Sequence, residues 1–87
     1  MNIPQRIFFN KIDDILYQEW NPIGFPVPKD EYRAYVPKIF ELILAGCSEK
    51  EIAEELSELE LGIVGSSNNA NCERVARLIV EEKAHLL

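Results

Sequence analysis

The chain has 87 residues, a formal net charge of −6, 47% hydrophobic residues and 28% charged residues. These values fit one folded domain spanning residues 1–87, and they exclude two independent cores and a disordered chain. The negative charge argues against nucleic-acid binding, and no apolar run is long enough to cross a membrane. The sequence shows no secretory signal pattern, and its two isolated cysteines do not require an oxidising compartment, so we expect a cytoplasmic protein.

Residues 4–19 have the periodicity of a first helix, with apolar residues at spacings of three and four. Pro4 falls in its first turn, where a missing N–H has no partner to lose. The predicted inward stripe is Phe8, Ile12, Ile15, Leu16 and Trp20.

The next segment, residues 20–28, is an apolar loop with three prolines, which we call the proline loop. Prolines remove backbone donors and push the preceding residues into extended conformations, so regular structure is excluded. Two interpretations stay open for this loop. It is either a lid over a core too small to close itself, or a docking surface with Trp20 or Phe25 as its anchor.

Helical periodicity returns over residues 29–45 and keeps its phase across Pro37. This pattern favours one kinked helix, with a break near Val36 as the alternative. Gly46 is a suitable residue to end the helix. The apolar positions of this segment are Tyr32, Tyr35, Val36, Ile39, Phe40, Ile43 and Leu44.

A capping box, Ser48 followed by Glu51, marks the start of a third helix, and Gly62 and Gly65 are expected to end it. The last helix is predicted to begin near Asn69 or Asn71 and to run to about residue 84. The inward residues of these two helices are Ile52, Leu56, Leu59 and Ile63, then Cys72, Val75, Ala76 and Ile79. No strand pattern competes, so we predict an all-α bundle of about four helices, with the proline loop between the first two.

The excess charge is concentrated on one segment, since residues 48–61 carry six glutamates against Lys50 alone, a net of −5. One interpretation is a solvated helix face. The other is electrostatic steering toward a basic partner by Glu51, Glu54, Glu55 and Glu58.

Residue patterns for catalysis or cofactor binding are missing. There is no phosphate-binding glycine loop and no zinc-ligand spacing. Cys47 lies at a predicted helix N-terminus, where the dipole favours a thiolate, but the single histidine, His85, is close to a chain end. We therefore predict no catalytic residues, no metal and no cofactor, and keep a thiol-dependent enzyme or sensor based on Cys47 as an alternative.

The motifs also resemble those of a family of small uncharacterised bacterial all-helical proteins. Trp-Asn-Pro-Ile-Gly at 20–24 is similar to the family's Trp-Asp-Pro-Ile loop, with Asn21 in place of the usual aspartate. Asp-Glu-Tyr-x-x-Tyr at 30–35 and the segments 45–56 and 72–78 also match, although residues 60–65 lack the family's Met-Gly step. The resemblance covers roughly residues 15–80. It implies a helical domain without assigned activity, and some such proteins look like immunity proteins that neutralise toxins.

Together these patterns predict a protein-binding module rather than an enzyme, most concretely an immunity-like inhibitor of a basic toxin. The expected partner is a protein with a basic surface, steered by the four glutamates above. Trp20, Phe25 or Tyr32 is the expected anchor. A structural or assembly domain, dimerising through the proline loop, is a further alternative, and the oligomeric state stays open.

Overall fold

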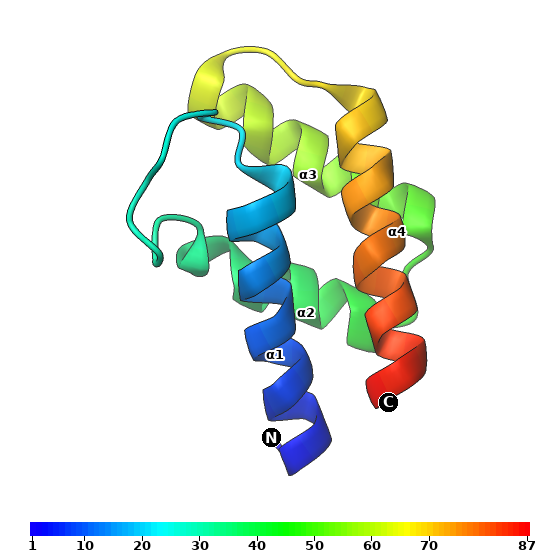
Figure 1. Cartoon of the computed structure of the whole chain (residues 1–87). Helices are drawn as coiled ribbons and strands as arrows, with labels where there is room; N and C mark the ends of the chain where they lie inside the picture. The colour runs from blue at the N-terminus through cyan, green and yellow to red at the C-terminus, as the bar shows by residue number, and fades with distance from the viewer.

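Four α-helices make up most of the computed structural model, which describes all 87 residues (Figure 1). They are α1 (Ile3–Ile15), α2 (Val36–Leu44), α3 (Glu49–Val64) and α4 (Asn69–Leu86). A π-helical turn, η1 (Leu16–Trp20), extends α1, and a 3-10 turn, η2 (Arg33–Tyr35), precedes α2. No strand is present, so the predicted all-α bundle of four helices is confirmed.

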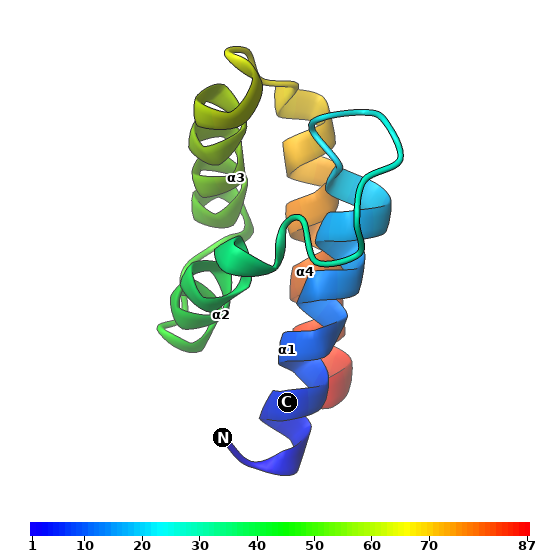
Figure 2. The ribbon, with the colours of Figure 1, turned by 90° about the vertical axis from the view of Figure 1, so that its left-hand side faces the viewer.

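The helices are arranged in two layers. In Figure 1, α1 and α4 lie side by side and run in opposite directions, with both chain ends at the same end of the molecule. Figure 2 shows α2 and α3 stacked as the second layer against this pair. The radius of gyration, 12.0 Å, is that of a compact domain of this length, about 12 Å.

The first helix begins with a capping box in which Asn2 and Gln5 each accept the other's backbone N–H, at 2.8 and 3.1 Å. Pro4 lies in the first turn, as predicted. The last turn is widened, because the Asn21 N–H donates to the carbonyl of Leu16 five residues back. The predicted inward stripe of this helix, from Phe8 to Trp20, is buried throughout.

The second helix is shorter than predicted. Residues 29–32 form turns, the 3-10 turn η2 follows, and the α-helix begins only at Val36. Pro37 therefore lies in a first turn, where it removes no hydrogen bond and causes no kink. The favoured single kinked helix over 29–45 is wrong, and the alternative, a break near Val36, is correct.

The end of α2 is a Schellman motif built on Gly46, whose φ of +86° suits glycine. The N–H groups of Gly46 and Cys47 donate to the carbonyls of Ile43 and Leu42, both at 3.0 Å. Lys83 of α4 adds a hydrogen bond from its ammonium to the Ile43 carbonyl at 3.2 Å. A cation at a helix C-terminus is stabilising, so α4 also helps to end α2.

Both remaining helices have side-chain caps. Ser48 caps α3 with the predicted capping box, and Gly65 ends the helix at a φ of +78°, whereas Gly62 lies inside it. The cap of α4 is Asn68, whose side chain accepts the Asn71 N–H at 3.1 Å, rather than either predicted asparagine. The helix also continues to Leu86, two residues beyond the predicted end.

Replacing Ser48 with alanine should lower the free energy of unfolding by about 1 kcal/mol, because one N–H of the first turn loses its acceptor. The Ser48 backbone N–H, then its hydroxyl, lowers the pKa of Glu51 below the ordinary 4.5. The stabilisation that comes from the Glu51 carboxylate, separate from that of the Ser48 hydroxyl, is thus present above pH 4.5 and is lost as the pH falls through the lowered pKa. Urea unfolding at neutral and acid pH would measure both effects. Ser66→Ala, in an exposed loop, is the control with an expected change under about 0.5 kcal/mol.

Candidate protein-binding surface

Trp20 is a core residue, with 2% of its surface exposed. Its ring packs edge-on against Tyr32 and Tyr35, with centroids 5.4 and 6.1 Å away. In this structure Trp20 offers almost no surface to a partner, because the indole is already enclosed by α1, η2 and α4, and its role as an anchor stays a prediction.

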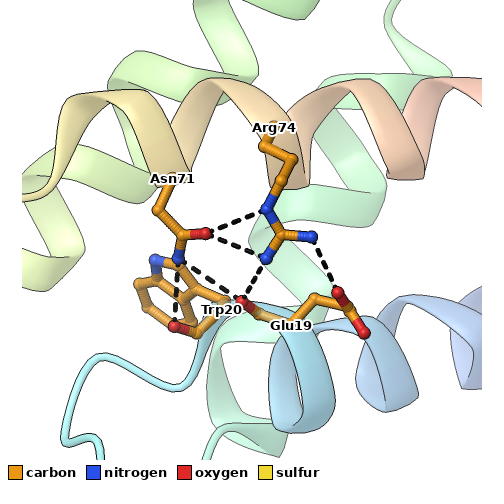
Figure 3. A network of polar contacts seen from close by, with 4 residues as sticks. All are labelled: Glu19, Trp20, Asn71 and Arg74. Atoms are coloured by element: carbon orange, nitrogen blue, oxygen red, sulfur yellow. Dashed lines mark hydrogen bonds and ion pairs between the residues drawn. The ribbon is translucent and has the colours of Figure 1, made fainter.

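Polar contacts from α4 hold the backbone beneath this indole (Figure 3). The Asn71 amide donates to the carbonyls of Glu19 and Trp20, both at 3.4 Å, and Arg74 donates to the Glu19 carbonyl at 2.9 Å. Arg74 also pairs with the Glu19 carboxylate at 2.7 Å. These bonds satisfy carbonyls that the end of a helix leaves without partners. They fix the start of the proline loop to α4.

Tyr32 is also buried, at 1% exposure, so it offers almost no surface to a partner in this structure, and its role as an anchor stays a prediction. Its hydroxyl donates to the Asn21 side-chain oxygen at 2.6 Å and accepts the Ile23 N–H at 3.3 Å. Burial raises the pKa of the Tyr32 phenol. Tyr32 instead ties the proline loop to the core, where Ile23 and Val27 pack at its edge.

Phe25 is the aromatic residue that the loop leaves outside, with 70% of its surface exposed. The Asn21 amide donates to the Phe25 carbonyl at 3.2 Å, and Asn21 itself adopts a φ of +29°. The loop is thus a lid over Trp20 and Tyr32 that keeps Phe25 on its outer surface. Of the three predicted anchors, only Phe25 is available for contact.

The four predicted steering glutamates lie on the outer side of α3. Glu51, Glu54 and Glu58 are exposed and Glu55 is half-buried. None of them forms an ion pair, whereas the three ion pairs of the protein are Arg33–Asp13, Arg74–Glu19 and Arg77–Glu49. The charge of these four glutamates is therefore not neutralised by ion pairs within the molecule, whereas Glu49 of the same segment is paired with Arg77.

An open groove of about 520 Å³ lies between α3 and α4 and contains two of these glutamates, Glu54 and Glu58. An ion pair between Arg77 and Glu49, 3.7 Å apart, closes one end. A hydrogen bond of 2.9 Å from the Ser57 hydroxyl to the Asn69 side chain crosses the other end. The complete lining is Glu49, Lys50, Ala53, Glu54, Ser57, Glu58, Asn69, Glu73 and Arg77.

The lining contains four carboxylates and two cations, a net charge of −2. Glu73 is the member that sequence reasoning missed, because the charges of residues 62–87 balance along the chain. Its spacing of four residues from both Asn69 and Arg77 places these three on one face of α4. Glu51 and Glu55 do not line the groove, so the structure divides the four predicted glutamates into two pairs.

Glu60 differs from its acidic neighbours because it is buried, at 5% exposure. Its carboxylate accepts the backbone N–H of Asn68 at 2.7 Å, and the Cys72 thiol lies 3.6 Å from its other oxygen. A buried carboxylate needs such donors to offset its lost hydration. Glu60 therefore holds the α3–α4 loop in place instead of contributing to the acidic surface.

Cys72, at 1% exposure, should resist thiol reagents until the protein unfolds. Burial, followed by the nearby Glu60 charge, raises the pKa of this thiol from 9.0 to about 11. Because only the unfolded chain ionises the thiol between these values, stability should decline as the pH rises from 9 toward 11. Iodoacetamide labelling followed by mass spectrometry should modify half-buried Cys47 first. Equal labelling rates at both cysteines in the native protein would contradict this assignment.

Cys47 is half-buried at the end of α2. No hydrogen bond connects it to the exposed His85, and its backbone N–H belongs to the Schellman motif that ends α2. No group of three or more His, Cys, Asp or Glu side chains is placed to hold a metal ion. None of the four helices is long and apolar enough to span a membrane.

Comparison with known proteins identified no relative of this chain. No family model matches the chain, and no curated protein or solved structure is significantly similar to it.

Proposed function

We propose that this protein is a non-enzymatic protein-binding module, most concretely an immunity-like inhibitor that recognises a basic surface on a toxin through α3. The observation that carries the proposal is the unneutralised charge of Glu51, Glu54, Glu55 and Glu58 on one helix. A basic partner is the chemistry that complements such a surface, and charge complementarity speeds encounter and selects partners.

This charge has a cost for the isolated protein. Glu51 and Glu55, like Glu54 and Glu58, are four residues apart, and like charges at this spacing destabilise a helix by roughly 0.2–0.5 kcal/mol per pair. No cation within the chain forms an ion pair with any of the four. Lysine or arginine side chains of a partner would relieve the repulsion, so binding would gain from it.

The proline loop adds a second contact of different chemistry. Phe25 is exposed on a loop whose backbone is held by Asn21 and, through it, by buried Tyr32. An aromatic side chain has only two rotatable side-chain bonds, so it loses little conformational entropy on binding. We assign Phe25 the role of the apolar anchor. Trp20 and Tyr32 support the loop from inside.

The test is affinity capture from a lysate of the source cells, with the wild-type chain and a variant carrying Gln at 51, 54, 55 and 58. Glutamine at position 51 can still complete the capping box, so the variant should fold. The matched control changes Asp14 to Asn and Glu31, Glu41 and Glu81 to Gln. All four control residues are exposed and unpaired, and the change in net charge is the same.

We expect a basic protein to be retained by the wild type and the control variant and to be lost from the α3 variant. Raising the salt concentration from about 0.05 to 0.5 M should weaken capture, because the screening length falls severalfold. Equal retention by all three chains, or binding insensitive to salt, would rule out recognition through α3.

A further inference from the structure

Beyond the Ser57 end of the groove, α3 carries two exposed apolar residues, Leu61 and Val64, which we call the apolar ledge. Leu61 follows Ser57, which lines the groove, by four residues, so the two lie on the same face of α3. Val64 is three residues further along the same stripe. Leu61 is 49% exposed and Val64 is 42% exposed, and both remain free for contact.

We propose that this groove binds an extended basic segment of the partner protein, with an apolar side chain of that segment resting on the ledge. The inference deepens the proposed function and rests on it. Charge complementarity identifies the occupant. Glu54, Glu58 and Glu73 face the groove without an ion pair, against one unpaired cation, Lys50, whereas Arg77 is paired with Glu49.

The spacing of the groove residues defines the order of side chains in that segment. Glu54 and Glu58 are separated by one helical turn, about 6 Å along the axis. Alternate side chains of an extended strand project to the same face about 6.6 Å apart, so two basic residues with one between them match the two glutamates. Leu61 lies about 4.5 Å beyond Glu58 along the axis, next to where the following same-face side chain would lie.

The matching segment therefore has basic residues at its first and third positions, an apolar residue at its fifth, and any residue between them. It lies along the groove in one chain direction or the other. The charged half contributes attraction that salt screens. The apolar half contributes burial that salt does not screen. This combination distinguishes a built docking groove from general attraction to an acidic helix.

The experiment is a nitrogen-15 NMR titration of the full chain with the capped peptide Lys-Ser-Lys-Ser-Leu and its reversed sequence. We expect one of them to shift the amide signals of Ser57, Leu61 and Asn69. Changing the peptide leucine to serine should weaken binding about fivefold through lost apolar burial. A peptide with glutamate in place of lysine should not bind.

Two protein variants with equal charge changes on the same helix test the position of the site. Glu54→Gln with Glu58→Gln should weaken binding about fivefold, from the loss of two exposed charge pairs. Glu51→Gln with Glu55→Gln, outside the groove, should change it less than twofold. Melting curves by circular dichroism would establish that both variants are folded.

Equal weakening by both pairs of substitutions, or shifts centred on Glu51 and Glu55, would overturn the groove while leaving recognition through α3 intact. Failure of both lysine peptides to bind would also overturn it. A failure of the proposed function itself would be seen separately. In that case the wild type and the variant with glutamine at positions 51, 54, 55 and 58 would capture the partner equally.

Discussion

Replacing Trp20 with alanine should lower the free energy of unfolding by about 3–5 kcal/mol. The indole is 98% buried, between α1, α4 and the rings of Tyr32 and Tyr35, so its removal leaves a large cavity and removes both aromatic contacts. A domain of this size has a total stability of roughly 4–13 kcal/mol, so the change would remove much of it. Urea unfolding followed by circular dichroism measures the effect without needing tryptophan fluorescence.

Phe25→Ala is the matched control, because it removes an aromatic ring from the same loop at a position that is 70% exposed. We expect it to change stability by less than about 0.5 kcal/mol. If Trp20→Ala leaves no folded protein to measure, Trp20→Phe should still show a loss of about 1–3 kcal/mol. A Trp20→Ala protein as stable as the Phe25→Ala protein would show that Trp20 is not part of the core.

Replacing Glu60 with alanine should cost about 1–3 kcal/mol, although Glu60 belongs to the most acidic segment of the chain. The substitution leaves the partly buried Asn68 N–H without the carboxylate that accepts it at 2.7 Å. It also removes the acceptor facing the Cys72 thiol. Relief of charge repulsion on α3 acts in the opposite direction, but exposed pairs contribute only a few tenths of a kcal/mol.

Glu58→Ala, two residues earlier on the same helix, is the control for this prediction. Glu58 is exposed and forms no hydrogen bond or ion pair, so its loss should be within about 0.5 kcal/mol of neutral. The difference between the two variants in urea unfolding isolates the buried contact from the change in net charge. If both variants gained stability equally, Glu60 would act as one more surface charge.

The limits of sequence reasoning are visible at the start of α2. Preserved apolar phase across Pro37 favoured one helix, because phase reports which residues face the core and not whether the backbone between them is continuous. In the structure, the side-chain hydroxyl of Tyr32 forms hydrogen bonds with Asn21 and Ile23 of the proline loop. The backbone of residues 29–32 forms turns, and the α-helix starts only at Val36. Those hydrogen bonds join residues nine and eleven positions apart, beyond the range of helical periodicity.

Features that depend on neighbours within about one helical turn were predictable from the amino-acid sequence. Apolar spacing identified the buried stripes of α1 and α4, but only half of that of α3, where Ile52 and Leu56 are buried and Leu59 and Ile63 are partly exposed. The capping box at Ser48 and the glycine at position 46 marked helix ends. These signals are local because a helix is closed by bonds between residues three to five apart. The concentration of charge on residues 48–61 was equally readable from the chain.

Which of the candidate binding residues remain exposed to a partner depends on the tertiary packing of the helices. Trp20 is enclosed because Asn71 and Arg74, more than fifty residues away, hold the backbone on either side of it. Glu60 is buried and Glu73 faces α3 for the same reason, that α4 packs along α3. Burial is a property of the whole packed chain, since a side chain loses water only when distant elements meet over it.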